Sequence, residues 1–427
     1  MPALVRSDGG CAAAQMDVRR IRWWAASPTR WNVARTWAII GVVTDDPTVQ
    51  PDPVWPNPTW EPWAAARPVP GFIHLDSAAA GRSSRAVLDA TSRHAMREAT
   101  EGAYVAAAAV APVIASLRAN VAALTGVDPE GVAFVESAES ALNAVLQVWP
   151  LTDGDAVAVA PSEWGPNLHA FRVSGLDTTW LDVDAAGLID LAALDRRLRT
   201  APPAFVHVTQ QASHRALRQP VAEMATMCTV AGVPLWVDAA QAAGHCAIDV
   251  GADVVYATSR KWLAGPRGVG LLAVKEPWRD VLRVDPSPMA TADDPLLSSV
   301  ESHEAHIAGR VGLATAVDEF IAIGPEAVSE RLDAVGRMTR AHLSELPNWT
   351  VVDPIASPGA ITAIAPATGQ DVFEVRERLL RSHSVVTTAC QVARAPLDMP
   401  VPWLRISPHV DATPEQIVTL CDALATL

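Results

Sequence analysis

Short apolar runs alternate with segments of helical periodicity over much of the chain after residue 71. The runs that predict β-strands lie at 132–135, 156–160, 178–183, 204–209, 233–237, 253–257 and 268–274. Apolar residues at helical spacing predict helices at 137–148, 188–199 and 220–231, between these strands. Strands that alternate with helices are typical of an α/β fold, in which helices cover both faces of a mostly parallel sheet. Ligands in such sheets bind at the carboxyl ends of the strands.

The segments that flank this region follow a different pattern. Before it, we predict a helix from about Arg85 and a second helix over 111–124 that stops at Gly126. After residue 300, the pattern predicts helices at 304–322, 325–346 and 371–382, with short strands at 361–365 and 402–406. The last helix begins at Pro414, where Thr413 and Gln416 have the spacing of a capping box.

These patterns divide the chain into three parts. We expect a Trp- and Pro-rich extension over 1–70, a large α/β domain over 71–305 and a small α+β domain over 306–427. Proline-rich sequence favours extended backbone over helix, so the extension is expected to be partly disordered. An alternative for its last 20 residues, 51–70, is a tryptophan arm that packs across the globular body.

Composition narrows the classes of protein that this chain can be. Of its 427 residues 50% are apolar and the net charge is −14, which fits a globular protein and argues against nucleic acid as a partner. Five cysteines without a CxxC pair indicate a reducing compartment and no structural metal. Pro112 interrupts the longest weakly polar run, so we predict no membrane-spanning segment. We therefore expect a cytoplasmic protein.

Lysine is rare in this chain, and one of its two lysines has unusual neighbours. Lys261 follows the predicted strand 253–257, and Asp238 follows the strand 233–237. A plain structural ion pair is one interpretation. The other is pyridoxal phosphate, which needs a lysine for its Schiff base and a carboxylate at its pyridine nitrogen.

The remaining needs of pyridoxal phosphate are also met near strand ends. Ser137 and Ala138 lie where a strand turns into a helix, so their backbone N–H groups could bind the phosphate. Thr258 and Arg260 could complete that phosphate cup, and Trp164 could stack on the ring. Each of these residues alone could have a purely structural role, in packing or in capping a helix. Only their combination favours a cofactor site.

These motifs resemble the fold-type I pyridoxal-phosphate enzymes, in particular the class V aminotransferase and cysteine desulfurase group. The resemblance covers roughly residues 72–425 and rests on His74–Ala79, Asp238–Gln241, Thr258–Lys261 with the following Gly-Pro-Arg-Gly, and Arg405. It implies that Lys261 is the catalytic lysine, that Gln241 contacts the ring hydroxyl and that Arg405 binds the substrate carboxylate. It also implies a homodimer that acts on a small amino-acid substrate.

Within that group the chain resembles the carbon–sulfur lyases of bacterial ergothioneine biosynthesis. They convert hercynylcysteine sulfoxide to ergothioneine by β-elimination, with pyruvate and ammonia as the other products. Trp164, Arg260 and the Ser213-His214-Arg215 loop support this likeness, which implies that His214 binds substrate. Cysteine desulfurases have histidine at the position of Trp164, but Cys390 lies where one branch of them has its persulfide cysteine. Cysteine desulfurase and aminotransferase activity therefore remain alternatives.

Overall fold

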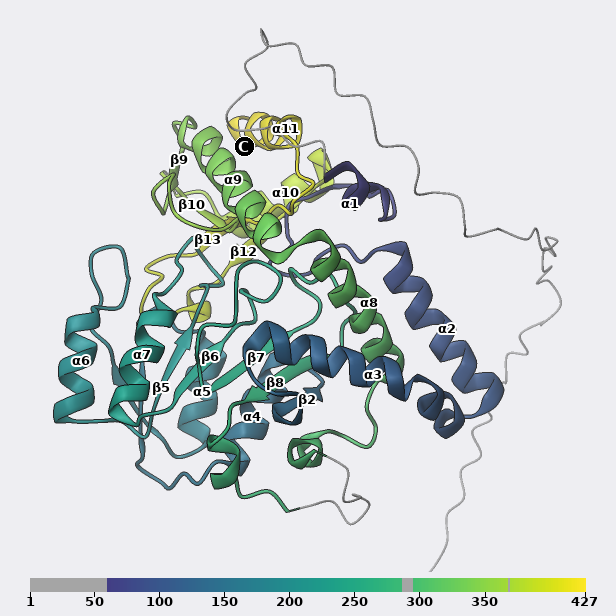
Figure 1. The fold of residues 1–427 in the computed structure, drawn as a ribbon. Coiled ribbons are helices and arrows are strands. Elements are labelled where there is room, and N and C mark those ends of the chain that lie inside the picture. The colour runs from purple at the N-terminus through teal and green to yellow at the C-terminus, as the bar shows by residue number, and fades with distance from the viewer. Residues whose placement is uncertain (1–59, 286–294, 368) are drawn as a thin grey trace, which may run out of the picture. The chain divides into compact units, whose positions relative to one another are not determined.

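The central element of the fold is a seven-stranded sheet. The structure, a computed structural model, describes residues 60–285, 295–367 and 369–427 (Figure 1). The strands run in the order β2-β8-β7-β6-β5-β3-β4. They are β2 (Val132–Val135), β3 (Ala156–Val159), β4 (Asp177–Trp180), β5 (Phe205–Thr209), β6 (Leu235–Asp238), β7 (Val254–Thr258) and β8 (Gly270–Val274). β8 is antiparallel to both of its neighbours, and every pairing from β7 to β4 is parallel, which confirms the predicted mostly parallel sheet.

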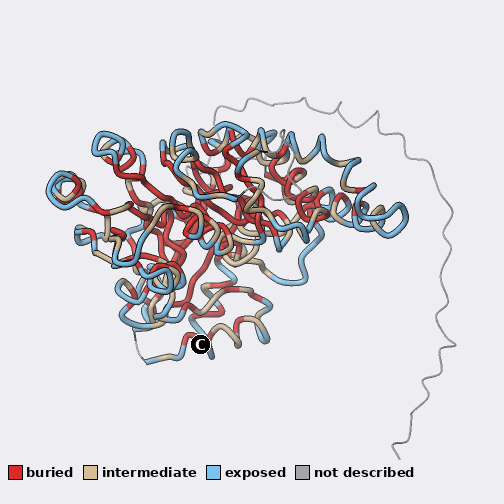
Figure 2. The backbone as a smooth tube through the Cα atoms, turned by 90° about the horizontal axis from the view of Figure 1, so that it is seen from below, coloured by how far each residue is buried: buried red, intermediate tan, exposed pale blue. Residues whose placement is uncertain are grey.

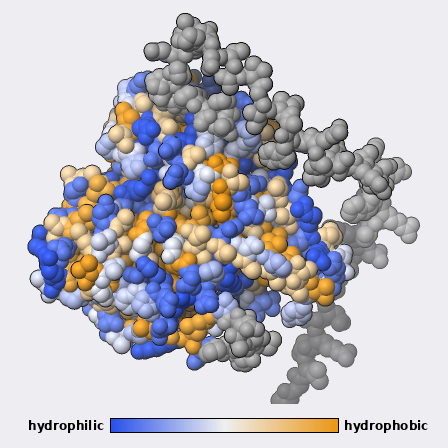
Figure 3. Space-filling view, viewed as in Figure 1, coloured by the Kyte–Doolittle hydropathy of each residue, from blue (hydrophilic) through white to orange (hydrophobic). Residues whose placement is uncertain are grey.

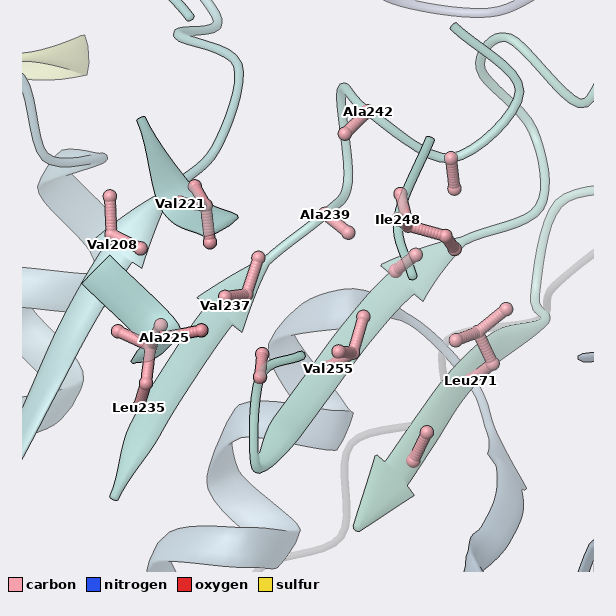
Figure 4. Packing of buried hydrophobic residues seen from close by; sticks show 14 of the residues in the cluster. Val208, Val221, Ala225, Leu235, Val237, Ala239, Ala242, Ile248, Val255 and Leu271 are labelled. Atoms are coloured by element: carbon pink, nitrogen blue, oxygen red, sulfur yellow. The ribbon is translucent and has the colours of Figure 1, made fainter. Parts of the chain in front are cut away.

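Helices cover both faces of this sheet. One face packs against α3 (Ala103–Thr125), α6 (Leu191–Thr200), α7 (Val221–Ala231) and α8 (Ile307–Ile323), and the other against α4 (Ala138–Val148) and α5 (Gly165–Val173). Figure 4 shows the first face, where Val237 and Val255 point to the same side as Leu271, close to Val221 and Ala225 of α7. Strands β5 to β8 are buried along their whole length, which explains why they read as continuous apolar runs. Figure 2 shows the buried backbone, in red, concentrated in the interior of the molecule.

The alanine-rich segment forms one helix and is not broken by its proline. Pro112 lies inside α3, which spans 23 residues and packs against α8 and α2 (Arg85–Glu101), so the expected break is wrong. The lost backbone hydrogen bond costs about 3 kcal/mol, and burial of Leu117 and Val121 in the core offsets it. By length and composition α3 could span a membrane, since its mean hydropathy reaches 1.6 in a window that is 22% buried. The absence of a membrane-spanning segment thus stays a prediction.

A second sheet follows in the chain, antiparallel and four-stranded. Its order is β12-β13-β10-β9, from β9 (Trp349–Val351), β10 (Thr362–Pro366), β12 (Thr388–Cys390) and β13 (Trp403–Ile406). The accompanying helices are α9 (Pro325–Ser344), α10 (Val372–His383) and α11 (Pro414–Ala425). The capping box that Thr413 and Gln416 predict at α11 is present with both of its hydrogen bonds. A short parallel pair joins β1 (Ile73–His74) to β11 (Val385–Val386), so the first strand of the described chain pairs with one of the last.

Tryptophans of the extension pack against the body where the structure describes them. Trp63 in α1 (Glu61–Ala65) is buried, and its ring stacks on His409 with centroids 4.4 Å apart. The Arg67 guanidinium lies 3.2 Å from the centroid of the same ring. The interpretation of 51–70 as a packed arm therefore holds from Trp60 onward. The expected disorder falls on residues 1–59, which lie outside the described part, and the two domain boundaries remain predictions.

Candidate active site

The carboxyl ends of β5, β6 and β7 open onto a cavity of about 350 Å³. Asp238 is the last residue of β6, and Thr258 ends β7 three residues before Lys261. Nine of the ten predicted site residues line this cavity: Ser137, Ala138, Trp164, Asp238, Gln241, Thr258, Arg260, Lys261 and Arg405. The parallel arrangement of the strands brings these side chains together, because it places their ends on one edge of the sheet.

Lys261 lies in a tight loop directly after β7. Ser259 and Gly265 close the loop through a backbone hydrogen bond of 2.9 Å, and a side chain at Gly81 would collide with the Lys261 carbonyl. Burial lowers the pKa of the Lys261 amine to about 7, Asp238 opposes the shift, and nearby arginines add to it. The amine can therefore lose its proton near neutral pH, as a nucleophile or base must.

Asp238 is buried, and its two carboxylate oxygens are held by different donors. Oδ1 accepts from the backbone N–H of Ala240 at 2.8 Å, and Oδ2 accepts from Asn167 Nδ2 at 3.0 Å. Burial raises the pKa of Asp238, whereas the charge of Lys261 and the Asn167 hydrogen bond counteract that rise. The carboxylate is thus fixed in place at the base of the cavity.

The start of α4 forms a cup of backbone N–H groups. Ser137 caps this helix, accepting a hydrogen bond from Ser140 N at 3.0 Å, and Ala138 is its first residue. Gly270 of β8 has no side chain, and any Cβ there would lie 2.4 Å from the backbone of Ser137, so glycine allows the cup to sit against the sheet. A helix N-terminus with Thr258 and Arg260 on the same cavity wall fits a phosphate.

Gln241 and Trp164 complete the surroundings of a planar ligand. Gln241 Oε1 accepts from Trp262 Nε1 at 2.8 Å, and Gln241 Nε2 donates to Ala78 O at 2.9 Å, which leaves a second N–H on Nε2 for a ligand. Trp164 stands at the start of α5, and the Arg394 guanidinium lies 4.9 Å from the centroid of its ring.

Arg405 reaches the cavity from β13 of the second sheet. It donates to Ser213 O at 2.7 Å and pairs with Asp76 Oδ1 at 3.0 Å, while its buried Nε has no protein partner. Asp76 also accepts from Thr388 Oγ1 at 2.7 Å. A buried guanidinium with an unused N–H fits a carboxylate ligand.

His214 is the predicted site residue that does not line the cavity. Its Nε2 lies 2.6 Å from Asp398 Oδ2, and Arg215 holds the same carboxylate at 2.7 Å. Burial lowers the pKa of His214, which the hydrogen bond to Asp398 opposes. The neighbouring Ser213 does reach the cavity wall. Substrate binding by His214 stays a prediction.

Several cavity residues were not found from the sequence. Asn167 lies in α5, a helix that the periodicity did not predict, and Arg394 ends a short 3-10 helix, Val392–Arg394, that was not predicted either. Arg267 belongs to the Gly-Pro-Arg-Gly motif noted in the sequence, which assigned it no role. The one available signal was the Glu163-Trp164 pair just after β3, which lies three to four residues before Asn167. Cys390 is fully buried in β12 among Ala363, Ala395, Met399 and Trp403, which agrees with its interpretation as a small apolar residue.

The donors on the cavity wall fit pyridoxal phosphate. A buried amine with a lowered pKa faces a buried carboxylate, and a helix N-terminus with hydroxyl and guanidinium groups can take the phosphate. Lys261, Asp238, Gln241 and the α4 cup would hold the aldehyde, the ring nitrogen, the ring hydroxyl and the phosphate in turn. When bound there, the group supplies an electron sink.

Comparisons with known proteins agree with this chemistry. Residues 73–418 match the family described as aminotransferase class V. A probable hercynylcysteine sulfoxide lyase from Mycobacterium tuberculosis is 44% identical over 363 residues, which cover 85% of this chain and 92% of that relative. A cysteine desulfurase from an Enterobacter species is 28% identical over 316 residues, which cover 68% of this chain and 77% of that relative.

Solved structures share the fold. A cysteine desulfurase from Escherichia coli superposes with a TM-score of 0.75 at 20% identity, over 86% of this chain and 97% of that one. A second, from Thermococcus onnurineus, gives 0.74 at 20% identity, over 83% and 94%. With a family match that spans most of its length, this chain is a pyridoxal-phosphate-dependent enzyme of the aminotransferase class V family.

Proposed function

We propose that this enzyme is a carbon–sulfur lyase that acts on cysteine S-conjugates, with hercynylcysteine sulfoxide as its substrate. The observation that carries the proposal is the convergence of Lys261, Asp238 and Arg405 on one cavity, in a chain 44% identical to a probable lyase of that name. The residues provide the chemistry of β-elimination, and the relative provides the substrate.

The chain's own residues divide the work of the reaction. Arg405 binds the α-carboxylate of the substrate through its guanidinium. Lys261 takes the α-proton, because a pKa lowered to about 7 leaves a large share of the amine neutral near pH 7. Asp238 keeps a proton on the ring nitrogen, and Trp164 covers the ring face.

Elimination then breaks the bond between the β-carbon and sulfur. The sulfoxide leaves as a sulfenate, which is a weaker base than the thiolate that a thioether would release, and the sulfenate takes up a proton to give the sulfenic acid. The three-carbon fragment hydrolyses to pyruvate and ammonia. A thiol reductant, itself oxidised to a disulfide, converts the sulfenic acid to the thiol ergothioneine with loss of water.

The two alternatives differ from lyase chemistry in what they require. A cysteine desulfurase needs an exposed cysteine nucleophile, whereas Cys390 of this chain is fully buried. Cysteine desulfurases also have histidine at the position where this chain has Trp164. An aminotransferase needs a keto acid and passes through the pyridoxamine form of the cofactor.

The test is product analysis with the purified, cofactor-loaded enzyme. Hercynylcysteine sulfoxide should yield pyruvate in equal amount to the substrate consumed, and Lys261→Ala should yield none. Alanine with enzyme-bound persulfide would instead show a desulfurase, and accumulation of pyridoxamine phosphate would show an aminotransferase. Either result overturns the lyase proposal and leaves the family assignment intact.

We further propose a cytoplasmic homodimer that binds neither nucleic acid nor membrane. Apolar side chains are exposed around the junction of α2 and α3, among them Met96, Tyr104 and Val105, and Figure 3 shows hydrophobic residues on the face that carries these helices. Such surface favours burial against a second copy. Light scattering should give twice the monomer mass, and Val105→Glu should shift it toward the monomer; a monomeric parent would refute the dimer.

A further inference from the structure

A series of hydrogen-bonded, buried polar side chains leads away from Asp238 into the protein interior. Glu163 and His207 are 1% and 0% exposed, and neither belongs to the lysine, carboxylate and arginine set that performs the reaction. Glu163 lies four residues after the end of β3, His207 lies in the middle of β5, and Asn167 lies in the first turn of α5. Buried polar groups of this kind are costly unless every one of them is paired.

Both oxygens of the Glu163 carboxylate accept hydrogen bonds. Oε1 accepts from Trp164 N at 2.9 Å, from Asn167 Nδ2 at 2.9 Å and from Thr209 Oγ1 at 2.6 Å. Oε2 lies 3.0 Å from Nδ1 of His207, which must donate because an ionised carboxylate only accepts. Burial alone would raise the pKa of Glu163, but His207 and these donors together lower it below its ordinary value.

Asn167 connects this carboxylate to Asp238. Its Nδ2 lies 2.9 Å from Glu163 Oε1 and 3.0 Å from Asp238 Oδ2, so its two N–H bonds are divided between the two carboxylates. The orientation of the amide follows from this, because its oxygen at either position would repel a carboxylate. Asp238 Oδ2 consequently receives a donor, and protonation on that side is blocked.

We propose that His207 and Glu163 act as positioning residues that lock the amide of Asn167, and that Asn167 in turn holds Asp238 ionised for the ring nitrogen of the cofactor. We call this series of side chains, from Asp238 through Asn167 and Glu163 to His207, the relay. At its far end the Tyr256 hydroxyl lies 2.8 Å from His207 Nε2. The charged and titratable groups that face Asp238 are Lys261 across the cavity, Glu163 behind Asn167 and Tyr256 on the neighbouring strand β7. The relay acts on the cofactor whatever the substrate is.

The experiment measures the ring nitrogen directly in the cofactor-loaded enzyme. Protein is loaded with pyridoxal phosphate labelled with ¹⁵N in the ring, and the ¹⁵N chemical shift reports whether that nitrogen carries a proton. Asn167→Leu removes the donor to Asp238 at similar volume, so the shift should move toward the unprotonated value and the dissociation constant of the cofactor should rise about tenfold or more. Glu163→Gln keeps an acceptor but loses the charge-assisted bond, so it should move the shift in the same direction and less.

A double-mutant cycle separates a relay from two independent effects. If Glu163 acts through Asn167, adding Glu163→Gln to Asn167→Leu should leave the ¹⁵N shift of the single Asn167→Leu variant unchanged. Asp253→Asn is the matched control, since Asp253 is a buried carboxylate that bonds Leu235 N at the far end of the same strands. The control should not move the shift.

Two results would overturn the relay. One is a ¹⁵N shift in Asn167→Leu that equals the parent's, and the other is an undiminished effect of Glu163→Gln in the Asn167→Leu background. Should Asn167→Leu fail to fold, Asn167→Ser removes the same amide with a smaller side chain, and the same outcomes decide. Failure of the relay would leave the lyase proposal standing, because pyruvate formation is measured separately.

Discussion

Arg405 Nη2 lies 3.0 Å from Asp76 Oδ1, although 329 positions separate the two residues in the chain. Asp76 follows β1 and Arg405 lies in β13, so the pair joins the first strand of the described chain to the second sheet. With Ser213 O on Nη1, the pair fixes two sides of the guanidinium and leaves the buried Nε unpartnered. The arginine is therefore oriented before any substrate arrives.

Replacing Arg405 by lysine should lower kcat/KM for the amino-acid substrate roughly 100-fold, because an ammonium cannot reproduce the planar fork. We expect most of the loss in KM, measured by pyruvate release under steady-state conditions. Arg337→Lys, on an exposed position of α9, is the matched control and should behave like the parent. A KM unchanged in Arg405→Lys would rule out this arginine as the carboxylate ligand.

Attachment of the cofactor should depend on pH through Lys261. Its pKa is lowered to about 7, so the neutral amine that attacks the aldehyde grows with pH below that value and saturates above it. Rates of covalent reloading of the cofactor-free protein, followed by absorbance, should rise roughly tenfold per unit below pH ~6 and level off above pH ~8. Lys275→Arg should leave the profile unchanged. A rate that keeps rising toward pH ~10 would show an unperturbed lysine.

Cys390→Ala should retain pyruvate formation within about twofold, because the thiol is buried in β12 and does not line the cavity. The measurement is kcat with hercynylcysteine sulfoxide, together with an assay for alanine from cysteine. Loss of turnover in a well-folded Cys390→Ala protein would favour the desulfurase alternative.

Trp63→Ala should destabilise the protein by about 3–5 kcal/mol, since it removes a buried ring that stacks on His409 and carries Arg67 on its face. Trp180→Ala is the control, because that ring is 43% exposed at the end of β4. Chemical denaturation of both variants measures the difference. Equal midpoints would show that the arm adds nothing to stability.

Much of the site was predictable because it depends on local sequence and on the parallel order of neighbouring strands. Lys261 and Asp238 each follow an apolar run, and parallel neighbours bring such ends to the same edge of a sheet. Asn167 was not predictable, since α5 begins with Gly165-Pro166 and has no clear apolar stripe. Its importance comes from two carboxylates on other elements, which no local pattern reveals.

The sequence by itself determined the class of fold and the placement of Lys261 and Asp238 at the ends of neighbouring strands, because strand and helix periodicity and the residues at strand ends are local properties. Only the tertiary structure decided that His214 pairs with Asp398 and does not line the cavity, that Pro112 stays inside a continuous helix and that Cys390 is buried. These outcomes depend on partners far away in the chain. The free energy of packing and pairing against such partners outweighs local preference, and it exists only once the chain has folded.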